Sequence, residues 1–201
     1  MNNIKTFENF NNQDIFKYIE NGDTKSVKNY IKSGYDLNIE GEYGFTPLIN
    51  STFNNEIKII KLLLNAGADV NKQDDYGNTA LIKATSNNKI EIVKLLLNAG
   101  ADVDKQNAYG ETPLICAASN DNREMVELLL DYYADEFFLK RDGKSFYDLL
   151  SNKNEEYFLQ KYPTSVYNAI SNNYKKSYTE FVKDYNIETL LSDEITETEW
   201  F

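Results

Sequence analysis

Side chains that could carry out chemistry are few in this sequence, and their spacing matches no catalytic arrangement. The chain has no histidine and one cysteine, Cys116, so it lacks a Ser–His or Cys–His nucleophile pair and an imidazole metal ligand. Paired carboxylates occur at Asp74-Asp75 and Glu155-Glu156, where surface turns account for them. No glycine-rich loop opens a helix as a phosphate site requires. The sequence therefore predicts a protein that is not an enzyme and binds neither a cofactor nor a metal ion.

The compartment is predicted from the cysteine count and from the apolar segments. One cysteine cannot form an internal disulfide, which fits a reducing interior, and Cys116 follows Leu114-Ile115 as a small packing residue. The first eight residues contain no apolar stretch of the kind that signal peptides carry. The longest apolar runs, such as Leu62-Leu63-Leu64, are too short to span a bilayer. We expect a soluble, cytoplasmic protein.

The 201-residue chain is acidic, with a formal net charge of −11 from 21 basic and 32 acidic residues. Residues 41–139 hold 8 of the basic and 15 of the acidic residues, a net charge of −7. Such a field repels nucleic acid and anionic membranes and speeds association with a basic partner. The alternative is that the acidity serves only solubility.

The sequence repeats with a period of 33 residues, and this period predicts the structural elements of the chain. Glycines recur at this interval, at Gly44, Gly77, Gly110 and Gly143. Two residues after each glycine begin similar segments, namely Thr46-Pro47-Leu48, Thr79-Ala80-Leu81, Thr112-Pro113-Leu114 and the weaker Ser145-Phe146-Tyr147. Upstream, residues 62–71 recur almost unchanged as residues 95–104.

Each recurring residue has a local structural reason. The repeated glycine adopts a backbone conformation that side chains resist, at the tip of a hairpin-like turn. Thr79 is placed to cap a first helix, and Pro47 suits a first helical turn, as does Pro113. Gly67 and Gly100 are placed to end second helices in the left-handed conformation. Left-handed turns between the two helices are predicted at Gly22, Asn55, Asn88, Asp121 and Asn154.

The period and these residues resemble the ankyrin repeat. The resemblance implies an all-α solenoid of paired antiparallel helices with hairpin-like turn tips and a helical C-terminal cap. A single domain is predicted over residues 1–185, followed by an acidic tail over residues 186–201. Within the domain we expect repeats over approximately 8–40, 41–73, 74–106, 107–139 and 140–162, and a degenerate capping helix pair over 164–185.

Two features depart from the family pattern. The histidine that usually follows Thr-Pro-Leu is replaced by Ile49, Ile82 and Ile115, so aliphatic packing is expected in place of an imidazole–threonine hydrogen bond. Tyr132-Tyr133 stands where the preceding repeats have Ala-Gly. A tyrosine is poorly suited to a left-handed site, and we therefore expect this junction to be altered locally.

The resemblance also implies a binding surface along the turn tips and the inward face of the first helices. The residues that fall there are Glu42, Tyr43, Phe45, Phe53, Asn54, Asp75, Tyr76, Asn78, Asn87, Tyr109, Glu111, Asn120, Arg141 and Asp142. Tyr43, Tyr76 and Tyr109 form a ladder, one in each of three successive repeats. Phe45 and Phe53 widen this ladder at one end. Aromatic anchors amid acidic and amide groups are typical of protein interfaces. The alternative is that the tyrosines only pack on their neighbours.

These features favour a protein–protein interaction module that binds its partner through the concave face and the turn tips, as an adaptor, an inhibitor or a sequestering scaffold. We expect a protein partner, basic in charge, rather than nucleic acid or a membrane, and a chain that is monomeric alone. One alternative is a bacterial immunity protein that neutralises a basic toxin such as a nuclease. Another is a host-interacting effector or viral ankyrin adaptor.

Overall fold

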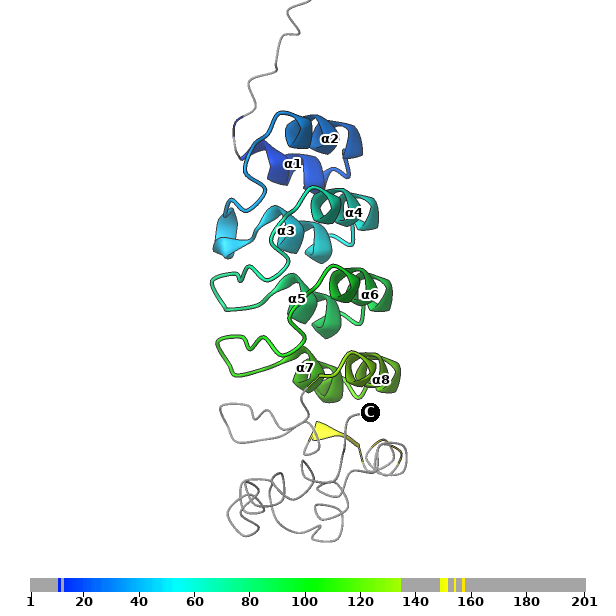
Figure 1. Ribbon diagram of the computed structural model, residues 1–201. Coiled ribbons are helices and arrows are strands. Elements are labelled where there is room, and N and C mark those ends of the chain that lie inside the picture. Colours follow the sequence, from blue (N-terminus) through cyan, green and yellow to red (C-terminus); the bar gives the residue numbers. More distant parts are fainter. Residues whose placement is uncertain (1–10, 12, 135–148, 152–153, 155–156, 158–201) are drawn as a thin grey trace, which may run out of the picture.

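The computed structural model of the chain describes residues 11, 13–134, 149–151, 154 and 157 (Figure 1). The predicted capping pair (164–185) and acidic tail (186–201) lie outside these residues, as does most of the repeat predicted over 140–162. The described helices are α1 (Asp14–Glu20), α2 (Thr24–Lys32), the 3₁₀ turn η1 (Glu42–Gly44), α3 (Pro47–Phe53), α4 (Ile57–Asn65), α5 (Ala80–Ser86), α6 (Ile90–Asn98), α7 (Pro113–Ser119) and α8 (Arg123–Asp131).

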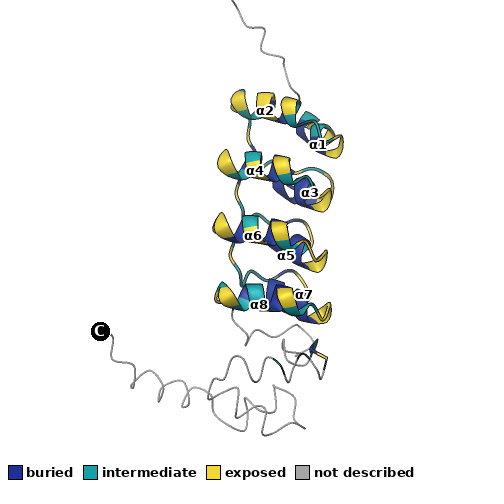
Figure 2. Cartoon of the chain, turned by 90° about the vertical axis from the view of Figure 1, so that its right-hand side faces the viewer, coloured by how far each residue is buried: buried dark blue, intermediate teal, exposed yellow. Residues whose placement is uncertain are grey.

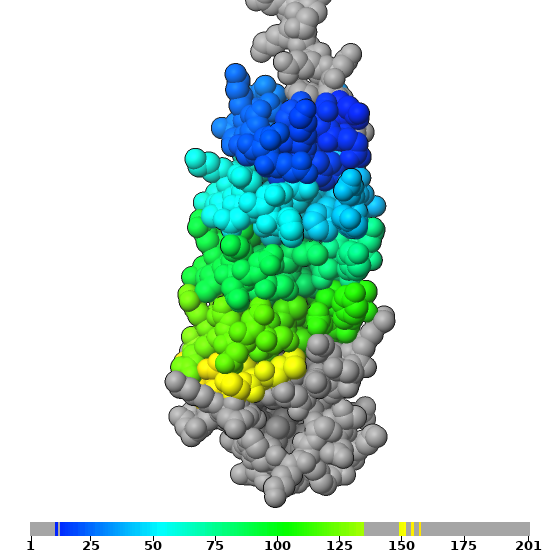
Figure 3. Space-filling model, turned by 180° about the vertical axis from the view of Figure 1, so that it is seen from behind, coloured from blue at the N-terminus to red at the C-terminus, as the bar shows by residue number. Residues whose placement is uncertain are grey.

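The α-helices stack as four antiparallel pairs in one column (Figure 1). The odd-numbered helices form one layer and the even-numbered helices the other. The turns that precede α3, α5 and α7 project beyond the odd-numbered layer. Each helix packs on its own partner, and α1, α3, α5 and α7 also pack on one another from pair to pair. The pairs therefore lie directly on one another in the space-filling view (Figure 3). The predicted all-α solenoid of paired helices is confirmed.

Threonine caps begin the odd-numbered helices from α3 onward. The threonine hydroxyl oxygen accepts the backbone N–H of the isoleucine three residues later, at 3.2–3.3 Å, in Thr46–Ile49, Thr79–Ile82 and Thr112–Ile115. Pro47 and Pro113 occupy the first helical turn, where a missing N–H costs no hydrogen bond. The capped isoleucines are buried, which confirms the aliphatic packing expected where related repeats carry histidine.

Left-handed turns separate the two helices of each pair, as predicted at Gly22, Asn55, Asn88 and Asp121, with φ between 50° and 63°. The prediction for Asn154 was wrong, because this residue has helical backbone. Its side-chain amide instead donates to Asp121 Oδ1 at 2.6 Å and to Asp121 O at 3.2 Å. The Asn154 side chain is thus buried against the preceding turn and links it to the next repeat.

The core lies between the two helix layers and repeats with the same period. Leu63, Leu96 and Leu129, which are 33 residues apart, are each 0% exposed, and burial of such a side chain contributes about 2 kcal/mol. The odd-numbered helices are buried over more of their surface than the even-numbered ones (Figure 2). Tyr30 is also 0% exposed, and burial raises its pKa to about 12, so the phenol stays neutral in the core.

The junction after α8 keeps the geometry of the earlier junctions up to Ala134, so the alteration predicted at Tyr132-Tyr133 was wrong, and residues 135–148 of the junction lie outside the described residues. Tyr133 has a φ of 61° and its N–H donates to Leu130 O, and the N–H of Ala134 donates to Leu129 O. The same two bonds follow α4 at Gly67. Ala134 and Leu129 are both buried, and their packing holds the backbone left-handed although Tyr133 must adopt a strained conformation there.

Replacing Tyr133 by glycine should therefore stabilise the protein. The side chain is 91% exposed and its removal costs no described packing, whereas a left-handed φ costs a non-glycine residue about 1–2 kcal/mol. Glycine gains more entropy on unfolding, which offsets part of this, so we expect a net gain of about 1 kcal/mol in the free energy of unfolding. Urea denaturation of Tyr133→Gly measures it. A Tyr133→Ala variant retains the strain and should show no gain.

Candidate functional site

The tips of successive repeats are joined by hydrogen bonds. The first, second and third tips are residues 41–45, 74–78 and 107–111. The N–H of Asp75 donates to Tyr43 O at 3.1 Å, and the N–H of Ala108 donates to Tyr76 O at 2.9 Å. The tips therefore form one continuous ribbon along the side of the odd-numbered helices (Figure 1).

The second and third tips are each organised by the side chain of their first residue. Asp74 Oδ1 accepts the backbone N–H groups of Tyr76 and Asn78 at 2.9 and 2.8 Å. Asn107 Oδ1 makes the two equivalent bonds in the third tip, each at 2.9 Å. Asp74 also pairs with Lys83 of α5 at 3.1 Å, and its side chain is fully buried. These bonds fix the tip backbone and leave the central tyrosine of each tip facing outward.

The first tip differs because Gly41 stands where the others have Asp74 and Asn107. Without a side-chain acceptor, the chain forms η1, and Tyr43 takes a left-handed φ of 57°. The ring of Phe16 in α1 fills the space that a side chain at position 41 would need, because a Cβ there would lie 2.9 Å from Phe16 Cζ. The first tip, with η1 and the neighbouring ring of Phe16, therefore presents a surface that the second and third tips lack.

The predicted tyrosine ladder is exposed, with Tyr43, Tyr76 and Tyr109 retaining 63%, 45% and 55% of their surface. Phe45 is half-buried. Its ring contacts Tyr43 and Phe53 edge-to-face, with centroids 6.4 and 5.9 Å apart. Phe53 remains 60% exposed. The rings of Tyr43, Phe45 and Phe53 are named here the aromatic cluster.

One face of the aromatic cluster already carries a cation. Lys83 Nζ lies 5.1 Å from the centroid of the Phe45 ring and 6.0 Å from that of Tyr76. Because Asp74 neutralises this ammonium group, Lys83 is held in place on the side of the second tip. The opposite side of the cluster faces α1.

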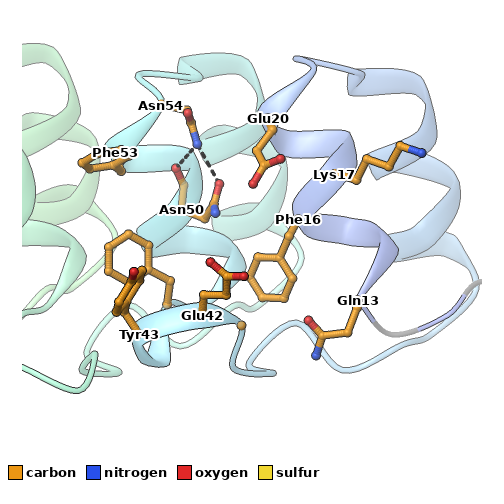
Figure 4. A pocket seen from close by; sticks show the side chains of 11 residues that line it. Gln13, Phe16, Lys17, Glu20, Glu42, Tyr43, Asn50, Phe53 and Asn54 are labelled. Atoms are coloured by element: carbon orange, nitrogen blue, oxygen red, sulfur yellow. Dashed lines mark hydrogen bonds between the residues drawn. The ribbon is translucent and has the colours of Figure 1, made fainter.

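A groove of about 490 Å³ lies between the aromatic cluster and α1 (Figure 4). Five predicted site residues line it: Glu42, Tyr43, Phe45, Phe53 and Asn54. Six further lining residues were not predicted: Gln13, Phe16, Lys17, Glu20, Gly41 and Asn50. The repeat period could have indicated two of them, because Lys17 and Glu20 lie 33 residues before Asn50 and Phe53.

The other predicted site residues that the structure describes lie along the same side of the stack but outside this groove. Asp75 is exposed on the second tip. Asn87 and Asn120 are exposed where α5 and α7 end, and Asn120 Nδ2 donates to Ser86 O at 3.0 Å. Asn78 and Glu111 are half-buried and take part in the tip hydrogen bonds. Arg141 and Asp142 lie outside the described residues.

Within the part of the chain that the structure describes, no three His, Cys, Asp or Glu side chains are grouped so that they could hold a metal ion. Cys116 is 7% exposed on α7, in the packing position expected for it. The features that stand out on this side of the stack are therefore aromatic rings, carboxylates and amides, which are groups suited to recognition.

A column of paired helices with a ribbon of tips along one side defines a helical repeat protein that presents an extended surface. A family model described as ankyrin repeats (3 copies) matches residues 15–107, 67–142 and 90–189, and the chain belongs to the ankyrin repeat family. Ankyrin repeats are generally protein–protein interaction modules. No curated protein matches the chain significantly. None of the helices in the described residues is long and apolar enough to cross a membrane.

Proposed function

We propose that this protein binds another protein through its tips and the adjoining ends of the odd-numbered helices, the predicted concave face. It acts as an adaptor, an inhibitor or a sequestering scaffold and performs no catalysis itself. The observation that supports this most directly is the aromatic cluster beside an open groove. Tyr43 and Phe53 are more than half exposed there, and exposed aromatic surface rimmed by polar groups is typical of interaction sites.

Phe53 supports the proposal because the fold does not require it. The equivalent residues, 33 and 66 positions later, are Ser86 and Ser119, at the ends of α5 and α7. Serine therefore ends α5 and α7. Among the described helix pairs, only the second, α3 and α4, exposes a phenylalanine at this position. A ring left 60% in water contributes little to folding, so binding gives a reason for its presence.

Replacing Phe53 by serine should leave the protein folded and weaken binding of the native partner about 30-fold, because a buried aromatic anchor contributes about 2 kcal/mol to an interface. The partner is first captured from the native cell and identified by mass spectrometry. Isothermal titration calorimetry then compares the variant with the parent chain. Tyr133→Gly, which removes an exposed ring far from the groove, is the matched control. Equal affinities for Phe53→Ser and the parent would move the interface elsewhere.

The partner is proposed to be basic. Glu20, Glu42 and Asp75 are exposed on the binding side, and among the described residues none of them makes an ion pair. This charge also supports a second candidate function, an immunity protein that covers the anion-binding site of a basic toxin such as a nuclease. The lone buried cysteine supports a cytoplasmic location.

Association with a basic partner should slow as salt is added. Long-range attraction between exposed charges is screened beyond about 8 Å at physiological ionic strength. The rate of electrostatically steered association is therefore expected to fall about 10-fold or more between low and physiological salt. Stopped-flow or surface-binding rates at low and physiological salt measure this effect. If the association rate constant stays constant while the partner still binds, the acidity serves solubility rather than attraction.

A further inference from the structure

Two carboxylates in the groove make no ion pair with any described residue. Glu20 extends from α1 and Glu42 from η1, and both line the groove. Neither makes an ion pair with any residue that the structure describes. The one basic residue of the lining, Lys17, points away from the other labelled side chains (Figure 4). The groove therefore has a net negative charge and unused hydrogen-bond acceptors.

Aromatic rings flank these carboxylates on both sides. In Figure 4, Tyr43 and Phe53 lie on one side of the groove and Phe16 of α1 on the other, with Glu20 and Glu42 directed toward its middle. The faces of such rings attract cations. The adjoining side of the aromatic cluster shows this attraction within the protein itself, because Lys83 lies over Phe45.

Amide groups line the groove beside the carboxylates. Asn54 Nδ2 donates to Asn50 Oδ1 at 2.7 Å and to Asn50 O at 3.0 Å. With its amide hydrogens directed at Asn50, the carbonyl oxygen Oδ1 of Asn54 makes no hydrogen bond that involves another described residue. Two carboxylates from separate elements, Glu20 and Glu42, and the amide side chains of Asn50 and Asn54 therefore line one groove.

We propose that this groove binds an arginine side chain of the partner protein, an inference that rests on the proposed protein-binding function. A guanidinium group has five N–H donors and no acceptor, and its flat faces stack on aromatic rings. It therefore satisfies several acceptors while its faces contact the rings. The volume of about 490 Å³ admits one such side chain together with part of its backbone.

Other occupants satisfy the groove less well. An apolar side chain would displace water from Glu20 and Glu42 without replacing the lost hydrogen bonds, which is costly for charged groups. An anion such as a phosphate would meet two carboxylates and no basic side chain directed into the groove. A lysine ammonium supplies the charge but has three donors at a single point and no flat face to stack on the exposed rings of Tyr43 and Phe53.

The test uses the full-length, ¹⁵N-labelled protein and four capped tripeptides with the sequence Gly-X-Gly, in which X is arginine, citrulline, lysine or leucine. Citrulline has nearly the shape of arginine without its charge. Backbone amide shifts of the groove residues should move with the arginine peptide, with a dissociation constant on the order of 1 mM. They should move at least 10-fold more weakly with citrulline. Equal binding of citrulline and arginine, or tighter binding of lysine or leucine, overturns the proposal.

Two charge variants show whether the carboxylates bind the guanidinium. Glu20→Gln and Glu42→Gln should each weaken binding of the arginine peptide about 10-fold, because each removes a charge-assisted hydrogen bond. Glu124→Gln makes the same change on the exposed surface of α8 and is the control, with no effect expected. Groove shifts that are equal in all three variants contradict the proposal.

The native partner separates this proposal from the broader one. If the arginine peptide leaves the groove amides unmoved while Phe53→Ser still weakens partner binding, the arginine assignment is wrong and the protein-binding function stands. If the peptide binds but no variant on this side of the stack affects the partner, the groove recognises guanidinium groups and the proposed interface is wrong.

Discussion

Replacing Gly77 by alanine should lower the free energy of unfolding by about 3 kcal/mol or more. Gly77 has a φ of 74°, which costs an L-residue about 1–2 kcal/mol. In addition, a Cβ at this position would lie 2.7 Å from the backbone nitrogen of Ala108. That nitrogen donates the hydrogen bond to Tyr76 that joins the second and third tips. The new methyl group must push the tips apart and break this bond, since backbone cannot move aside as a flexible side chain would.

Gly67→Ala is the matched control for this prediction. Gly67 also has a positive φ, 86°, but a Cβ there would have no neighbour within 4 Å. Only the conformational strain of about 1–2 kcal/mol is therefore expected. Urea denaturation of both variants, followed by circular dichroism, gives the difference. Equal losses of stability would mean that the close contact between tips contributes nothing and that backbone strain alone explains the glycine.

Replacing Asp74 by alanine should cost about 3 kcal/mol. The change removes the acceptor for the N–H groups of Tyr76 and Asn78, and it leaves Lys83 without the carboxylate that neutralises it. Because the Asp74 side chain is fully buried, water does not fully replace these bonds. The second tip should lose its fixed shape, and hydrogen exchange at the amides of Tyr76 and Asn78 should accelerate.

Asp74→Asn separates the turn from the ion pair. The third tip uses Asn107 at the equivalent position and makes the same two backbone hydrogen bonds with an amide oxygen. The asparagine variant should therefore keep the backbone of the tip. It should lose the pair with Lys83 and the 3.3 Å hydrogen bond from Asn78 Nδ2 to Asp74 Oδ2, a loss of about 1–2 kcal/mol. If Asp74→Asn is as unstable as Asp74→Ala, the charge of Asp74 matters more than its backbone hydrogen bonds.

The repeated elements could be predicted from the sequence because they depend on residues close to one another in the chain. A threonine caps the N–H three residues later, and a left-handed turn favours glycine, asparagine or aspartate at one position. Both patterns recur every 33 residues, so Thr79 and Asn88 could be assigned by position alone. The structure has a capped helix at the first and a φ of 56° at the second.

The groove could be predicted only in part because it depends on contacts between repeats. The five groove residues that were predicted lie in the first tip and at the end of α3, where the family pattern points to binding. Phe16 was missed because it fills space left by the missing side chain of Gly41, a relation between residues 25 positions apart. The side of Phe45 that Lys83 covers likewise depends on how the third repeat packs on the second.

Tyr133 shows the limit of a rule about single residues. A tyrosine is disfavoured in a left-handed conformation, and the sequence therefore suggested a rearranged junction. Up to Ala134 the structure retains the turn of the earlier junctions, because Ala134 and Leu129 are packed in the core. A local preference of about 1–2 kcal/mol is smaller than the cost of exposing those buried side chains.

The hydrogen-bonded ribbon of tips has a consequence for how such a gene can change in length. The hydrogen bond from Asp75 to Tyr43 joins the same repeat positions as the bond from Ala108 to Tyr76, because each residue lies 33 positions before its counterpart. Each helix packs mainly within its own pair or on an adjacent pair. An in-frame deletion of residues 74–106 would set Asn107 where Asp74 now begins a tip, and the new joint would match the joint removed. Duplication of the same segment would lengthen the stack in the same way. Natural selection can therefore vary the span of this protein by whole repeats while the groove beside Phe53 is inherited intact.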